Sequence, residues 1–174
     1  MRFLLPLVLI VPSVAFAAGD GAAPKPSKTT KSCKNGQVWD KKSKSCVNPS
    51  HHGLDEDTLY QAARELAYDG QYQAAQHVLA SMADPQSDRA LTYWGFTYRK
   101  MGQIETANAF YEQAIAKNPD NILARSYMAQ GFVTEGRTDD AIAQWREIKA
   151  RGGEGTWAEA SLREAIRTGM TYNY

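Results

Sequence analysis

Few residues in this 174-residue chain belong to the types that perform catalysis or bind metals. The histidines are His51, His52 and His77, and the cysteines are Cys33 and Cys46. His51 and His52 are adjacent in a polar stretch, where neighbouring side chains do not easily face one metal ion. The sequence contains no phosphate-binding loop and no G-x-S-x-G, H-E-x-x-H or C-x-x-C pattern. We therefore expect a protein that is not an enzyme and that uses no metal and no cofactor.

Cationic and aromatic residues are mixed in the stretch RALTYWGFTYRK, residues 89–100. Arginine and tyrosine often anchor protein interfaces, and the guanidinium fork of arginine suits a carboxylate. The stretch favours a protein or peptide partner that carries acidic side chains or a free C-terminus. The alternative is that the aromatic residues are core and that Arg99 and Lys100 are a solvated helix end.

A spacing of 34 residues relates this part of the chain to the part that follows it. The corresponding residues are Gly102 and Gly136, Ala107 and Ala141, and Tyr111 and Trp145. At this spacing a small residue is matched by a small residue and a large apolar residue by a large apolar one. Such a match is the signature of a structural repeat. Glycine permits the turn between two helices. The alanines and Gly95 mark close helix contacts, and the aromatic residues fill the remaining space.

A set of eight small, aromatic and turn residues at fixed spacings closely resembles the tetratricopeptide repeat (TPR), a helix-turn-helix unit. The residues that carry the resemblance are Trp94, Gly95, Tyr98, Gly102, Ala107, Tyr111, Ala114 and Pro119. The resemblance implies an all-α solenoid. Its array, residues 55–155, would contain three TPR-like repeats at residues 56–87, 88–121 and 122–155. Two residues depart from the pattern: Arg125 replaces a large apolar residue, and Gly153 replaces a proline. Arg125 either faces the groove or lies along the packed surface.

Residues 156–174 are expected to form a capping helix and a tail, because a repeat array must shield its last apolar face. The expected buried face is Ala158, Leu162, Ala165 and Ile166, and the expected solvent face is Glu159, Arg163 and Arg167. In the tail, Met170, Tyr172 and Tyr174 either dock, which would allow self-association, or fray.

By the same resemblance, the array is a scaffold that binds partners along a concave groove formed by the first helix of each pair. Carrying the groove positions across gives a predicted partner-binding set. The set is Tyr60, Arg64, Arg89, Thr92, Tyr93, Phe96, Arg99, Lys100, Tyr127 and Gln130. Fold alone does not identify the partner.

The segment 1–17, MRFLLPLVLIVPSVAFA, has the organisation of a cleavable signal peptide. Arg2 precedes an apolar run, and small residues before Ala18 predict cleavage near Ala17/Ala18. The run is shorter than the roughly 20 apolar residues that span a bilayer. We therefore expect a periplasmic or secreted protein without stable membrane insertion, with an uncleaved anchor as the alternative.

Residues 18–54 are expected to be a flexible basic linker. Residues 18–52 contain seven lysines and two aspartates, whereas residues 53–174 contain 12 Lys/Arg and 17 Asp/Glu. Such an arm can contact an anionic surface, or it can be a solvated connection. We expect no nucleic-acid partner.

Cys33 and Cys46 are expected to form a disulfide, because both follow an export signal. Asn35-Gly36 is a turn signal, so the enclosed segment predicts a small hairpin. The stretch CKNGQVWDKKSKSC vaguely resembles one hairpin of chitin-binding peritrophin-type modules, which contain several more cysteines. That resemblance implies an alternative function, in which the basic hairpin binds an envelope polysaccharide and Trp39 stacks on a sugar. Otherwise Trp39 covers the disulfide.

Overall fold

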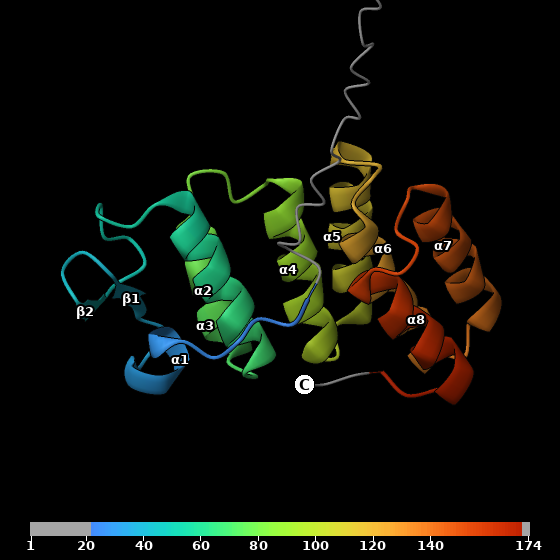
Figure 1. The fold of residues 1–174 in the computed structure, drawn as a ribbon, viewed down its shortest axis with the longest axis horizontal. Helices are drawn as coiled ribbons and strands as arrows, with labels where there is room; N and C mark the ends of the chain where they lie inside the picture. The colour runs from blue at the N-terminus through green and yellow to red at the C-terminus, as the bar shows by residue number, and fades with distance from the viewer. Residues whose placement is uncertain (1–21, 172–174) are drawn as a thin grey trace, which may run out of the picture.

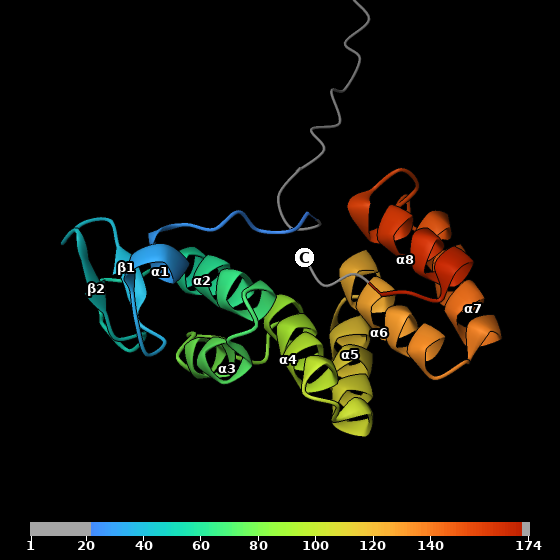
Figure 2. The same ribbon diagram turned by 90° about the horizontal axis from the view of Figure 1, so that it is seen from below.

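Seven helices form a curved stack in which neighbouring helices are antiparallel (Figures 1 and 2). The structure, a computed structural model, describes residues 22–171. The predicted signal peptide with its cleavage site, and Tyr172 and Tyr174 of the tail, lie outside this range. The stack consists of α2 (Glu56–Tyr68), α3 (Tyr72–Ala80), α4 (Asp88–Lys100), α5 (Ile104–Lys117), α6 (Ile122–Thr134), α7 (Thr138–Ala150) and α8 (Trp157–Thr168). The predicted all-α solenoid of three helix pairs and a final helix is confirmed.

The first helix of each pair, and also α8, begins at a side-chain cap. The side chains of Asp55, Ser87, Asn121 and Thr156 each accept a hydrogen bond from the backbone N–H three residues further on. Such caps satisfy one of the N–H groups that lack a partner inside the helix. The second helices have no side-chain cap and follow tight turns, in which Gly102 and Gly136 have φ values of 78° and 75°. These left-handed conformations favour glycine.

Helices α4 and α5 approach each other closely at Gly95. A Cβ atom built on Gly95 would lie 2.6 Å from two ring atoms of Tyr111. Tyr111 itself is fully buried, and this burial raises the pKa of its hydroxyl to about 12. The alternation of small and aromatic residues in the sequence therefore comes from one helix crossing, in which a large ring occupies the space above a glycine.

The two departures from the repeat pattern both have structural causes. Arg125 lies along the packed surface, where its guanidinium donates to the carbonyl of Pro119 and to the Gln144 side chain. Burial lowers the pKa of Arg125, which is only 7% exposed. Gly153 donates its backbone N–H to the carbonyl of Ile148, and a Cβ there would lie 2.6 Å from an Ile148 methyl carbon. Proline has no N–H and could not make this bond.

Helix α8 covers the end of the stack by packing against α6 and α7, and Leu162 is fully buried in this contact. One expectation about its outer face is wrong. Glu159 is 1% exposed rather than solvated, because it accepts a hydrogen bond from the indole N–H of Trp145 and pairs with Arg163. A carboxylate is stable at such a buried position when donors compensate its desolvation.

The opposite end of the stack is covered by a small N-terminal cap, residues 28–47. It contains α1 (Lys28–Ser32) and an antiparallel hairpin of β1 (Val38–Asp40) and β2 (Ser45–Val47), linked by the predicted Cys33–Cys46 disulfide. Val38 is 1% exposed, and a Cβ on Gly36 would lie 3.2 Å from the Cβ of Ala74 in α3. The hairpin and the disulfide are therefore as expected, and this part of the predicted linker packs against the array.

The contact at Gly95 predicts a large effect of substitution. Gly95→Leu should lower the free energy of unfolding by about 1–3 kcal/mol, because the buried Tyr111 ring has no space to move into. Urea denaturation followed by circular dichroism would measure the change. Ala109→Ser, on the exposed face of α5, should change stability by less than about 0.5 kcal/mol. A neutral Gly95→Leu variant would contradict the helix crossing.

Candidate functional site

Helices α2, α4, α6 and α8 form the concave side of the stack (Figure 2). Aromatic side chains of these four helices form a continuous row. Tyr60 of α2 contacts Tyr93 of α4 with ring centroids 5.7 Å apart, and Tyr93 is 6.1 Å from Tyr127 of α6. Phe96 is 5.0 Å from Tyr127, which in turn is 6.0 Å from Trp157 of α8. Edge and tilted ring contacts at these distances are favourable, so the row connects the three repeats and the final helix.

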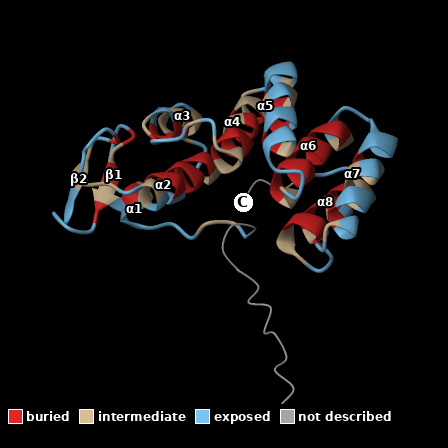
Figure 3. Cartoon of the chain, turned by 90° about the horizontal axis from the view of Figure 1, so that it is seen from above, coloured by how far each residue is buried: buried red, intermediate tan, exposed pale blue. Residues whose placement is uncertain are grey.

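Most of the residues predicted for the groove are buried, as is the inner part of the stack in general (Figure 3). Those with exposed fractions of 8% or less are Tyr60, Arg64, Thr92, Tyr93, Phe96, Arg99, Tyr127 and Gln130. Arg89 and Lys100 are half-buried. The aromatic members thus provide a rigid floor, and the two half-buried cations are the predicted groove residues that reach its edge.

Two arginines contact tyrosines at the N-terminal end of the aromatic row. The guanidinium of Arg89 lies 4.7 Å from the ring centroid of Tyr60 and pairs with Asp57 at 2.7 Å. The side-chain N–H of Arg64 donates to the Tyr93 hydroxyl at 3.0 Å. Cation–π contacts of this kind hold the guanidinium groups in fixed positions.

A second cationic group surrounds Phe96 in the middle of the row. The Lys100 ammonium is 5.5 Å and the Arg99 guanidinium 5.7 Å from the centroid of the Phe96 ring. Burial, with a smaller contribution from the charge of Arg99, lowers the pKa of Lys100 to about 8. An anion bound here would favour the charged ammonium and reverse part of this shift.

Two of the predicted groove residues form hydrogen bonds between helices. The hydroxyl of Thr92 accepts from the Asn121 side chain at the junction of α4 and α6. The Gln130 amide donates to the hydroxyl of Ser126 within α6 and to the hydroxyl of Ser161 in α8. These bonds hold successive first helices in register, and their polar atoms contribute less to the concave surface than the cations do.

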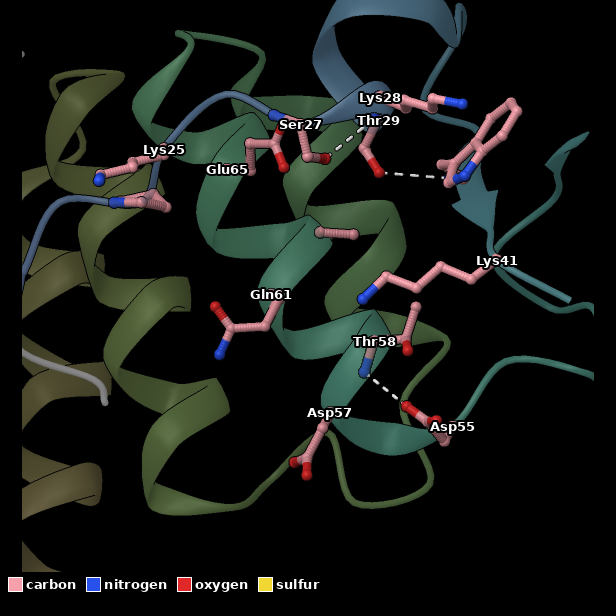
Figure 4. A pocket seen from close by; sticks show the side chains of 13 residues that line it. Lys25, Ser27, Lys28, Thr29, Lys41, Asp55, Asp57, Thr58, Gln61 and Glu65 are labelled. Atoms are coloured by element: carbon pink, nitrogen blue, oxygen red, sulfur yellow. Dashed lines mark hydrogen bonds between the residues drawn. The ribbon is translucent and has the colours of Figure 1, made fainter. Parts of the chain in front are cut away.

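A pocket of about 690 Å³ lies between the N-terminal segment and α2 (Figure 4), and no sequence pattern predicted it. Its walls come from the extended segment that includes Lys25, from α1, and from Trp39 and Lys41 of the hairpin. Its base is one face of α2 that includes Gln61 and Glu65. The lysines were visible only as a basic stretch, because nothing in the sequence indicated that this stretch would fold against α2.

Glu65 anchors the N-terminal segment to α2. One of its carboxylate oxygens accepts hydrogen bonds from the backbone N–H of Ser27, at 2.5 Å, and of Thr30, at 3.1 Å, and from the Thr30 hydroxyl at 2.5 Å. The Arg64 guanidinium donates to the carbonyl of Ala22 at 2.7 Å. These contacts keep the extended segment along α2, where Figure 2 shows it in blue.

His51 and His52 are adjacent before α2, and His77 lies on α3. His51 accepts a hydrogen bond from the Gly53 backbone, and His77 is exposed on α3. Residues 22–171 contain no group of three or more His, Cys, Asp or Glu residues that could hold a metal ion. In the same range, no helix has the length and apolar character needed to cross a membrane.

Comparison with known proteins identifies one repeat. Residues 88–121, which contain α4 and α5, match the family model of the tetratricopeptide repeat. No match is found among curated proteins or solved structures. The match supports a tetratricopeptide repeat protein and covers one of the three helix pairs. Such repeats generally mediate protein–protein interactions and are usually scaffolds rather than enzymes.

The anchoring role of Glu65 predicts that its removal will release the N-terminal segment. Glu65→Ala should lower the free energy of unfolding by about 1.5–3 kcal/mol, because three donors lose a charged acceptor. Hydrogen exchange of the amides of residues 27–30 should accelerate at the same time. Glu112→Ala, an exposed change on α5, is the control and should leave both measurements unchanged. Unaltered exchange in Glu65→Ala would contradict the anchor.

Proposed function

We propose that this chain is an exported, non-enzymatic scaffold that binds a protein or peptide partner along the concave side of its repeats. The observation that carries the proposal is the row of packed aromatic rings bordered by Arg89 and Lys100, the cations near the two ends of α4. The buried rings hold the first helices in fixed positions, so the cations at the edge of the row are already placed to select the charge of a partner. An acidic segment complements this surface.

The proposed compartment is the periplasm or the extracellular space. The predicted signal peptide motivates this location, and the Cys33–Cys46 disulfide supports it because disulfides persist in oxidising compartments. Self-association through the tail is an additional hypothesis of the sequence analysis, and of its three residues the structure describes Met170, which is 70% exposed.

Binding of an envelope polysaccharide through the hairpin has less support. The Lys28 ammonium lies 4.3 Å from the centroid of the Trp39 ring, so it covers the face on which a sugar would stack. The backbone N–H of Trp39 also donates to the hydroxyl of Thr29. Trp39 thus contributes to the packing of the cap, which favours the concave side as the binding surface.

Charge reversal at the edge of the aromatic row tests the proposed function. A double variant, Arg89→Glu/Lys100→Glu, should lose the partner that the wild-type protein retains from an envelope extract, because both half-buried cations would repel an acidic segment. The control Lys117→Glu, on the exposed end of α5, should retain it. Circular dichroism would verify folding. Equal retention by the double variant and the control would exclude the concave side as the binding surface.

The lowered pKa of Lys100 predicts a pH dependence of binding. Lys100 is charged below its pKa of about 8 and neutral above it. Affinity for an acidic partner should therefore fall as the pH rises from 7 to 9. In a Lys100→Arg variant the side chain stays charged, so the fall should be smaller. Titration of the retained partner at both pH values would measure this difference, and equal falls in the two proteins would contradict the role of Lys100.

A further inference from the structure

The pocket between the N-terminal segment and α2 is lined by three lysines and three carboxylates, and it lies beside the proposed binding surface. We propose that this pocket binds an extended acidic segment of the partner, with Lys25 and Lys41 as its main cationic contacts. The inference rests on the proposed function and assigns a second, separate contact region to the same partner.

The carboxylates of the pocket are already used by other groups of the protein. Asp55 caps α2 by accepting from the backbone N–H of Thr58 at 2.7 Å, and this hydrogen bonding lowers the pKa of Asp55. Asp57 pairs with Arg89, and Glu65 holds the N-terminal segment. Each of these carboxylates therefore already accepts a hydrogen bond from another group of the protein.

The cations and the amide group of the pocket differ from these carboxylates. Within residues 22–171, the ammonium groups of Lys25 and Lys41 make no hydrogen bond and no ion pair. Gln61 uses its side-chain oxygen to accept from Arg64, which leaves its NH₂ group as a donor on the pocket side. In Figure 4 the Lys41 side chain extends across α2 and the Gln61 side chain points away from it, so the two groups contribute to different parts of the pocket. The two lysine ammonium groups and the Gln61 NH₂ group are donors, so a ligand with carboxylate acceptors fits them.

Two contacts connect the pocket with the concave surface. Asp57, which lines the pocket, pairs with Arg89, and Gln61, which also lines it, accepts from Arg64. A chain that lies along the aromatic row can therefore continue into the pocket over the exposed face of α2. The volume of about 690 Å³ lies within the usual range of ligand pockets and leaves room for a few extended residues.

The pocket is preformed rather than created by its ligand. Glu65 fixes the wall formed by the N-terminal segment, and the disulfide joins Cys33, at the end of α1, to the strand paired with Trp39. A preformed site avoids the entropic cost of ordering its walls on binding. The Lys28 ammonium over Trp39 favours a peptide over a sugar, because it occupies the aromatic face that a sugar would need.

Defined probes test the pocket directly. Fluorescein-labelled hexaglutamate should bind the full chain measurably by fluorescence anisotropy, and hexaglutamine should bind at least about tenfold more weakly. The double variant Lys25→Glu/Lys41→Glu should weaken hexaglutamate binding by about tenfold or more, because both charged donors become repulsive. Lys31→Glu/Lys34→Glu is the matched control: it changes the net charge equally at exposed positions of the cap outside the pocket, and it should change the affinity less than threefold.

Three results would overturn the inference. Equal binding of hexaglutamate and hexaglutamine would exclude anion selectivity, and equal weakening by the two double variants would show general attraction to the basic cap. Tighter binding of labelled hexagalacturonate than of hexaglutamate would assign the pocket to an acidic glycan. The pocket variants leave Arg89 and Lys100 intact. A negative result for the pocket can therefore be distinguished from a negative result for the concave surface. The charge reversals at Arg89 and Lys100 test the concave surface separately.

Discussion

The structure depends on covering the two open ends of a helix stack. A helix pair in a repeat array buries one apolar face against each neighbour, so the first and last pairs each have a face that would contact water. At the C-terminal end α8 covers α6 and α7 with Leu162. At the N-terminal end the covering element is a disulfide-linked hairpin with one short helix. Its Gly36 has no side chain, and this permits close contact with Ala74 of α3. The two solutions differ in secondary structure but satisfy the same constraint.

The N-terminal solution has a functional consequence. A hairpin alone is marginally stable in water, so the disulfide and the contacts with α2 and α3 support each other. Glu65 provides a buried acceptor for the chain that enters α1, and this contact brings a lysine-rich segment onto an otherwise acidic array. The pocket at their junction therefore arises from the covering of the stack. Its cations come from the cap, and its base is a repeat helix.

Much of the fold was predictable from the sequence, because the spacing of Gly95 and Tyr111 reports a local helix crossing that both residues require. The disulfide was predictable for a similar reason, since only two cysteines are present. The fate of polar residues was less predictable. Glu65 and Glu159 look like ordinary solvent-facing carboxylates in the sequence, yet each is buried against donors that are distant or on another helix. Helical periodicity identifies a face, but it contains no information on which segment will cover that face.

The same reasoning explains how a concave surface can have buried aromatic residues and still serve for recognition. Tyr93 and Tyr127 lie between successive helices, so their rings fix the curvature of the array more than they contact a ligand. In the proposed function, specificity would depend on groups at the edge of the row, where the cost of desolvation is lower and charge would select the partner. Arg89 and Lys100 occupy such positions, and the lysines of the cap extend the same charge beyond the first repeat. In this proposal the buried aromatic rings stabilise the array, and the half-buried cations at the edge of the row choose its partner.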